Sequence, residues 1–187
     1  MKKLILSAMA VCAFGLASAQ EGGFKVGVHA GMPMGDAGDM YSFNFGADVA
    51  YLWEVADGFK AGVTTGYSYF SGKEYDAAGD LGDLGDWGDW GDLLDDMDIP
   101  GGGKVKVNGA FIPVAATGQY SFSDNFFGGA DLGYALYAGD GDGDGGFYYQ
   151  PKVGYQTEKI EVFVSYKGIS ADGASISTLG AGFAYKF

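Results

Sequence analysis

The stretch "YSFNFGADVAYLWEV", residues Tyr41 to Val55, changes side-chain character at every position and decides the fold class. Its apolar face is formed by the odd-numbered residues: Tyr41, Phe43, Phe45, Ala47, Val49, Tyr51, Trp53 and Val55. Its other face includes Ser42, Asn44, Gly46, Asp48 and Glu54. Because successive side chains of a β-strand point to opposite faces, this period of two predicts a long strand with one apolar face.

The same alternation recurs in the rest of the chain. It is found at 24–34, 59–69, 110–122, 126–138, 147–156, 160–168 and 177–187. Helical periodicity is absent, and no stretch beyond the N-terminal segment reaches the length of about 18 consecutive apolar residues that a membrane-spanning helix needs. The sequence therefore predicts eight strands and no transmembrane helix.

The connections between the expected strands alternate in length. Tight turns are expected at 56–58, 123–125 and 157–159, and longer acidic loops at 35–40, 72–104, 139–146 and 170–174. Short turns at one end and long loops at the other are typical of transmembrane barrels, and closure leaves no sheet edge. A soluble sandwich or lipocalin-like barrel would also alternate, but its surface would need many mixed charges. We therefore predict an all-β chain that forms an eight-stranded antiparallel up-and-down transmembrane β-barrel.

The N-terminal segment has the pattern of a secretory signal. Lys2 and Lys3 precede a short apolar run, and small residues at 17–19 form an expected cleavage site. We expect residues 1–19 to be a signal peptide and residues 20–187 to be the barrel domain. Removing this segment changes the net charge from −13 to −15 and removes Cys12, the one cysteine. The chain has no arginine, and its acidity argues against a nucleic-acid partner.

Three segments resemble one family of membrane proteins. The last strand, "TLGAGFAYKF", ends in Phe187 after Phe183 and Tyr185; "FIPVAATGQYSF" has an Ile-Pro step; and "FKVGVHAGMPMG" opens the first strand. On these segments the chain resembles the small outer-membrane β-barrel proteins of Gram-negative bacteria, of the OmpA/OmpX-like type without a periplasmic domain. The resemblance implies a location in the cell outer membrane, contact with its lipid bilayer, and recognition of Phe183, Tyr185 and Phe187 by the barrel-insertion machinery. We expect a monomer.

The inward face of the expected barrel carries charges of both signs. These are Lys25, His29, Lys60, Lys152, Lys167 and Lys186, with Asp48, Glu54, Asp131 and Glu161. The interior of an eight-stranded barrel is just wide enough for side chains, and unpaired buried charges are costly. We expect a plugged interior braced by ion pairs. The alternative is a narrow pore for ions or small solutes.

His29 is the one histidine of the chain, and Ser68 and Ser165 share its predicted inward face. A lipid-modifying barrel enzyme would need a nucleophile next to a base. No local motif joins either serine to His29, so we expect no enzymatic activity and treat the lipid-modifying enzyme as a third interpretation.

The loop "GDGDGDGG" at 139–146 places Asp140, Asp142 and Asp144 at the spacing of the first half of a calcium loop. The twelfth position of that motif would be Pro151 instead of the required Glu, which excludes a complete EF-hand. The sequence leaves open a solvated acidic loop or a weak Ca²⁺ site. We expect no other cofactor.

The repeat "GDLGDLGDWGDWGDLLDDMD" at 79–98 lies within the longest expected loop. Its candidate Ca²⁺ ligands are Asp83, Asp86 and Asp89, and its candidate binding residues are Trp87 and Trp90. A plain solvated tether is one interpretation, and a strip that binds an extracellular protein or glycan is the other. We predict a structural or surface-interaction role, with the Gly/Asp-rich loops presented outside the cell.

Overall fold

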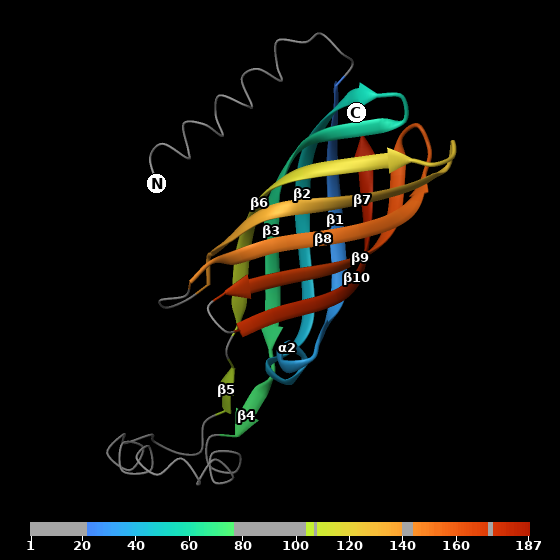
Figure 1. Cartoon of the computed structure of the whole chain (residues 1–187). Coiled ribbons are helices and arrows are strands. Elements are labelled where there is room, and N and C mark those ends of the chain that lie inside the picture. Colours follow the sequence, from blue (N-terminus) through green and yellow to red (C-terminus); the bar gives the residue numbers. More distant parts are fainter. Residues whose placement is uncertain (1–21, 77–103, 107, 140–143, 172–173) are drawn as a thin grey trace, which may run out of the picture.

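The computed structural model describes residues 22–76, 104–106, 108–139, 144–171 and 174–187. Eight antiparallel strands close into one barrel in the order β1-β10-β9-β8-β7-β6-β3-β2 (Figure 1). The barrel strands are β1 (Gly22–Met34), β2 (Tyr41–Ala56), β3 (Phe59–Gly72), β6 (Gly109–Ser121), β7 (Phe126–Tyr137), β8 (Gly146–Gln156), β9 (Ile160–Ala171) and β10 (Ala174–Lys186). The prediction of an all-β, eight-stranded up-and-down barrel is confirmed.

Two ends of the barrel differ in their connections. Three tight turns lie between β2 and β3, β6 and β7, and β8 and β9, at the end that we call the turn end (Figure 1). In the first of them Gly58 has a φ of 69°, a left-handed conformation that glycine adopts without strain. The opposite end, which we call the loop end, carries α2 (Asp36–Met40) between β1 and β2. No helix in the described residues is long and apolar enough to cross a membrane.

The loop end departs from the sequence prediction in the expected loops at 35–40, 170–174 and 72–104. Residues 36–40 form the short helix α2, with Ala37 buried, rather than a plain loop. The expected loop at 170–174 is wrong, because β9 and β10 continue until Ala171 pairs with Ala174. Ile169 pairs there with Ile176, so extending the strands adds inward apolar contacts.

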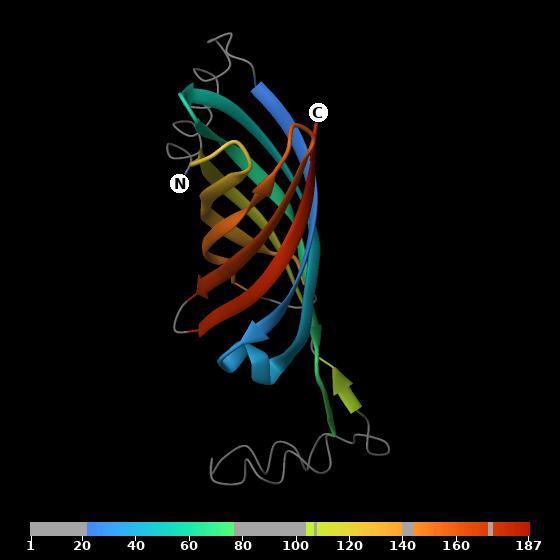
Figure 2. The same ribbon diagram turned by 90° about the vertical axis from the view of Figure 1, so that its right-hand side faces the viewer.

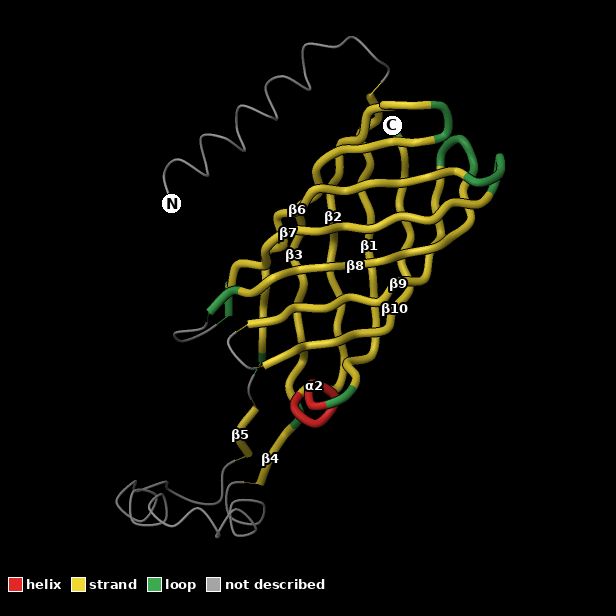
Figure 3. Tube along the Cα trace, in the orientation of Figure 1, coloured by secondary structure: helices red, strands yellow, loops and turns green. Residues whose placement is uncertain are grey.

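The expected loop at 72–104 begins and ends as sheet. Strand β4 (Glu74–Asp76) pairs with β5 (Lys104–Lys106) as a separate two-stranded ribbon. Figure 2 shows this ribbon continuing from the ends of β3 and β6, away from the barrel. Figure 3 shows the same arrangement, with α2 at the mouth of the barrel beside it. The ribbon therefore joins the barrel to the acidic segment at 77–103.

The outer face of the barrel is an apolar belt with aromatic residues toward both ends. Exposed aliphatic residues of the belt include Val28, Val114, Leu132, Val153, Val164 and Leu179. At the turn end the rings of Phe24, Phe122, Phe126, Tyr155, Tyr185 and Phe187 contact one another in pairs or chains. At the loop end Phe43, Phe45, Tyr69, Phe147, Tyr149 and Tyr166 do the same. An apolar band between two aromatic girdles is the lipid-facing surface of a membrane barrel.

Candidate functional site in the barrel lumen

An apolar cluster fills the lumen at the loop end. Its buried members are Phe70, Phe111, Ala115, Ala135, Tyr148 and Ile169. The rings of Phe70 and Phe111 meet edge to face, with centroids 5.8 Å apart. Sequence reasoning missed this cluster because it treated the inward face as polar. The signal was present, since Phe70, Phe111 and Tyr148 occupy inward positions of the alternation.

Deeper in the lumen a polar group of side chains surrounds His29, and we call it the His29 cluster. It consists of His29, Asn44, Asp48, Ser68 and Lys167. The Nδ1 atom of His29 lies 2.6 Å from Oδ2 of Asp48. Its Nε2 atom lies 2.7 Å from Nζ of Lys167 and 3.3 Å from Oγ of Ser68. Sequence reasoning named these side chains separately but did not bring them together.

The hydrogen-bond roles in the His29 cluster follow from lysine chemistry. A lysine ammonium group only donates, so Nε2 of His29 accepts from Lys167 and Nδ1–H donates to Asp48. The Oγ atom of Ser68 accepts from Lys167 at 3.0 Å and from Nδ2 of Asn44 at 3.0 Å. Because the lone pair of Nε2 is already used, His29 cannot serve Ser68 as a base in this arrangement. A serine, a histidine and an aspartate meet here, but they form a structural network.

A second ion pair lies across the middle of the lumen. The Nζ atom of Lys152 lies 2.8 and 2.7 Å from the two carboxylate oxygens of Asp131, and both side chains are buried. Lys152 also lies 5.9 Å from the centroid of the Phe163 ring, within the range of a cation–π contact. Beside this pair, Nε2 of Gln150 donates to Oγ of Ser165 at 2.9 Å. In this part of the lumen, both carboxylate oxygens of Asp131 therefore accept from the ammonium group of Lys152.

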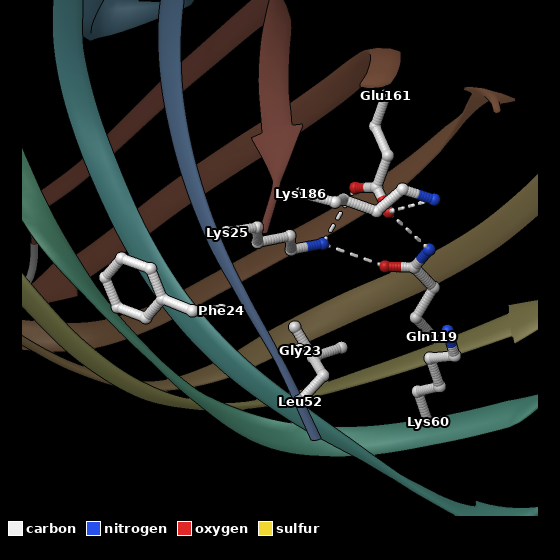
Figure 4. Close-up of a pocket in the computed structure, with 8 residues that line it drawn as sticks. All are labelled: Gly23, Phe24, Lys25, Leu52, Lys60, Gln119, Glu161 and Lys186. Carbon is white, nitrogen blue, oxygen red and sulfur yellow. Dashed lines mark hydrogen bonds and ion pairs between the residues drawn. The ribbon is translucent and has the colours of Figure 1, made fainter. Parts of the chain in front are cut away.

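The turn end of the lumen holds the third polar group, shown in Figure 4. The Nζ atom of Lys25 donates to Oε2 of Glu161 at 2.8 Å and to Oε1 of Gln119 at 2.9 Å. Gln119 in turn donates to Oε1 of Glu161 at 3.0 Å and to Oε1 of Gln156 at 3.2 Å. The Nζ atom of Lys186 lies 4.0 Å from Oε1 of Glu161. The carboxylate of Glu161 thus accepts hydrogen bonds from Lys25 on β1 and Gln119 on β6. It also lies near the ammonium group of Lys186.

Two small cavities lie between these groups. One, of about 30 Å³, is lined by residues from all three polar groups, including Asp48, Lys152 and Lys25. The other, of about 40 Å³, is lined at the turn end by Lys25, Lys60, Gln119, Glu161 and Lys186, among others. A buried water needs roughly 10–15 Å³, so each cavity has room for a few waters at most.

The structure brings together most of the inward charges that the sequence predicts. The partner of Asp48 is His29 rather than a lysine. Glu54 is different: it is exposed near the turn end, and within the described residues no ion pair within 4 Å reaches it. The expectation that Glu54 joins the ion pairs of the lumen is therefore wrong, because its side chain remains in solvent at the end of β2.

The predicted loop sites lie mostly outside the described residues. Asp83, Asp86, Asp89, Trp87, Trp90, Asp140 and Asp142 are not described. Asp144 is described, and its side chain is exposed just before β8. Among the described residues, no group of three His, Cys, Asp or Glu side chains could hold a metal ion. Ca²⁺ binding by these loops stays a prediction.

The predicted insertion signal lies on the outer face of β10 and at the end of the chain. Phe183, Tyr185 and Phe187 are all exposed, and the rings of Tyr185 and Phe187 are in contact. Phe187 also contacts the ring of Phe24 on β1, and its backbone N–H donates to the carbonyl of Phe24 at 2.9 Å. Their recognition by the insertion machinery stays a prediction.

Comparisons with known proteins place the fold. No family model matches the chain, and no curated protein matches its sequence. A de novo designed transmembrane β-barrel aligns with 91% of this chain and 100% of its own, at 12% identity and a TM-score of 0.51. The outer-membrane protein Ail of Yersinia pestis, determined in a phospholipid bilayer nanodisc, aligns with 89% of this chain and 100% of its own, at 12% identity and a TM-score of 0.53.

The chain has the fold of a small outer-membrane β-barrel. The apolar belt and the aromatic girdles of this structure agree with that fold. The predictions of a transmembrane barrel and of an OmpA/OmpX-like resemblance are confirmed at the level of the fold, and the predicted outer-membrane location is consistent with that fold. At 12% identity the likeness carries no information about individual functional residues.

Proposed function

We propose that this protein is a closed outer-membrane barrel with a structural or surface-interaction role, and that it is not an enzyme. The observation that carries the proposal is the filled lumen. An apolar cluster occupies its loop end, and buried ion pairs and hydrogen bonds occupy the rest. Breaking such pairs by moving one charge away is costly, so the interior favours a rigid brace over an open path.

The proposed working surface is the loop end. The ribbon formed by β4 and β5 leads directly into residues 77–103, which carry eight aspartates and no lysine. This segment also contains Trp87 and Trp90, and exposed aromatic residues usually mark a binding surface. We propose that the loop end lies outside the cell and presents this acidic segment to an extracellular protein or glycan.

The turn end would then face the periplasm. Short turns on that side and longer loops on the outside are the usual arrangement of outer-membrane barrels. In this orientation Phe183, Tyr185 and Phe187 lie at the periplasmic side of the apolar belt, where the barrel-insertion machinery could contact them. Because the barrel closes on itself through β1 and β10, it needs no second copy to pair its edges, and we propose a monomer.

A conductance measurement tests the closed-lumen proposal. Purified folded barrel is added to planar lipid bilayers, and the current is recorded at fixed voltage in potassium chloride. We expect no stepwise openings from the native protein. Regular openings at native sequence would replace the closed scaffold by the alternative, a narrow pore for ions or small solutes.

One observation favours the alternative function, a narrow pore for ions or small solutes. The 30 Å³ cavity contacts all three polar groups, so water could connect them without large movements of the backbone. The apolar cluster at the loop end still separates this cavity from the outside. A pore would therefore require Phe70 and Phe111 to move.

A further inference from the structure

The cavity at the turn end has an excess of positive charge. Three of its lining residues are lysines, Lys25, Lys60 and Lys186, and one is an acid, Glu161. Figure 4 shows the three amino groups on the side of Gln119 and Glu161, whereas the ring of Phe24 points away from them. The chain as a whole is strongly acidic, so the balance of charge at this cavity is opposite to that of the whole chain.

The one carboxylate in this cavity does not balance the three lysines. Glu161 forms a close pair with Lys25, with 2.8 Å between Nζ and Oε2. Lys186 lies 4.0 Å from the other oxygen of Glu161, too far for a hydrogen bond. Among the described residues, no ion pair within 4 Å reaches Lys60.

The nearest further acid on the adjacent strand does not correct this imbalance. Glu54 pairs with Lys60 through the backbones of β2 and β3, but its side chain is exposed and does not line the cavity. Lys60 and Lys186 are each only partly buried, so their ammonium donors are available at the mouth. The amide of Gln119, by contrast, is already used by Lys25, Glu161 and Gln156.

We propose that this cavity binds one small oxyanion, of the size of a carboxylate or a single phosphoryl group, held chiefly by Lys60 and Lys186. The volume of about 40 Å³ is roughly three times what one water needs, which suits such a group and excludes a sugar ring. Ammonium groups bind phosphate oxygens as point charges with charge-assisted hydrogen bonds. This site goes beyond the proposed surface role, because it lies at the opposite end of the barrel.

The oxyanion can come from two sources with the same chemistry. One is free phosphate or a small carboxylate in solution. The other is the phosphate of a phospholipid head group, because the cavity also borders Gly23 and Phe24, where β1 meets the turn-end girdle. The experiment therefore has one arm for each source.

In the first arm, the folded full-length protein in an uncharged detergent is titrated with inorganic phosphate, and separately with acetate, by calorimetry. Chloride holds the ionic strength constant. We expect saturable binding of at least one of the two anions. The substitutions Lys60→Met and Lys186→Met should each raise the dissociation constant about tenfold, because each removes a charge-assisted contact.

The matched control is Lys159→Met. Lys159 is exposed in the turn between β8 and β9 at the same end of the barrel, carries the same charge and does not line the cavity. Its substitution should leave the dissociation constant unchanged. Glu161→Gln provides a change in the opposite direction: removing the competing carboxylate should tighten binding, provided that the variant still shows the folded, heat-modifiable band in a gel.

In the second arm, the protein is folded in vesicles of phosphatidylglycerol and phosphatidylethanolamine, transferred to uncharged detergent, and examined by native mass spectrometry. Retained phospholipid that is lost in Lys60→Met and Lys186→Met but kept in Lys159→Met assigns the head group as the source. Saturable binding of free anion without retained lipid assigns a soluble oxyanion. The proposal is overturned when neither arm shows binding, or when Lys159→Met weakens binding as much as the two lumenal substitutions do.

Discussion

The ammonium group of Lys167 lies 2.7 Å from Nε2 of His29, although the two residues are 138 positions apart in the chain. This contact fixes how the imidazole can be used. Because Nε2 accepts from Lys167, only Nδ1 remains to donate, and it donates to Asp48. The contact therefore converts a serine, a histidine and an aspartate into a brace across four strands.

The position of His29 depends on the absence of a side chain at Gly46. A Cβ atom at Gly46 would overlap the carbonyl of Tyr67 and lie 2.7 Å from Nε2 of His29. We expect Gly46→Ala to lower the free energy of unfolding by about 1–3 kcal/mol, the usual cost of overpacking. Urea unfolding in detergent micelles measures the change. Gly23→Ala is the control, since nothing lies within 4 Å of its added Cβ; equal losses in both variants would refute the explanation.

The apolar cluster should be both a stabilising core and the seal of the lumen. Phe70 is fully buried in it, so Phe70→Ala should cost about 3–5 kcal/mol of unfolding free energy. The combined variant Phe70→Ala with Phe111→Ala should also raise the frequency of current steps in planar bilayers. Leu132→Ala, on the lipid-facing side of β7, is the control and should not conduct. A double variant that stays silent, although folded, would place the seal elsewhere in the lumen.

Removing one partner of the Asp131–Lys152 ion pair should destabilise the barrel more than removing both partners. Asp131→Leu leaves the buried ammonium group of Lys152 without its carboxylate, and we expect a loss of about 3–5 kcal/mol. Replacing both residues, as Asp131→Leu with Lys152→Met, should recover much of that loss. Urea unfolding of the native protein, the two single variants and the double variant forms a double-mutant cycle, which gives the coupling energy between the two residues. Glu158→Leu, at an exposed turn position, serves as the control and should change stability by less than about 0.5 kcal/mol. An additive cycle would mean that the pair is wet and weakly coupled.

The last residue should matter for assembly more than for the folded state. Phe187 is the most exposed of the three proposed signal residues, and it contacts Phe24 and Tyr185 only at the rim of the barrel. We expect its deletion to lower the amount of folded barrel in the outer membrane and to raise degradation, read as loss of the heat-modifiable band. The control is Phe122→Ala, because Phe122 is another exposed aromatic residue at the turn-end rim of the barrel. Equal yields of native protein and deletion variant would remove the signal role.

The acidic segment should respond to a hard divalent cation. Carboxylate oxygens are the preferred ligands of Ca²⁺, and we expect weak binding at about 10⁻⁴–10⁻³ M that moves Trp87 and Trp90 into a less polar setting. The measurement is tryptophan fluorescence during a Ca²⁺ titration in a Trp53→Phe background. A saturating blue shift should vanish when Asp83, Asp86 and Asp89 become Asn.

The comparison variant for that titration replaces Asp140, Asp142 and Asp144 by Asn, which removes the same charge from a different loop. It should leave the fluorescence response intact. A flat titration of the parent at constant ionic strength would leave the segment as a solvated tether, and the tryptophans would then require a protein or glycan partner.

The alternation with a period of two was sufficient to predict the barrel, because odd-numbered and even-numbered residues of a strand lie on opposite faces. From Phe43 to Trp53 the strand β2 has the predicted inward and outward faces, whereas the register shifts at both of its ends and Tyr41 packs against the lumenal ring of Phe70. This alternation does not predict the register between neighbouring strands. The register decides which inward charged side chains contact one another. His29 stands opposite Gly46 on β2 and Gly182 on β10. The missing side chain at Gly46 leaves space for the imidazole ring, whereas the missing side chain at Gly182 leaves space for the ring of Phe163.

The loop end was predicted least well for a different reason. Acidic composition suggested loops at 35–40 and 170–174, but local composition does not report the tertiary contacts available there. Ala37 buries its side chain against the barrel mouth, and Ile169 and Ile176 gain contacts by extending their strands. Composition predicts solvation correctly only where no apolar side chain can reach a neighbour.

The hydrogen-bonded closure between β1 and β10 sets the order in which this protein can be assembled. Strand β1 must find β10, and Val26 cannot meet Tyr185 until the strands between them have been synthesised. Until then both strands have unpaired backbone groups along one side, which invites aggregation with other chains. A contact of such long sequence separation also makes folding slow. The free edges of β1 and β10 therefore have to stay apart from other strands until the two strands can join.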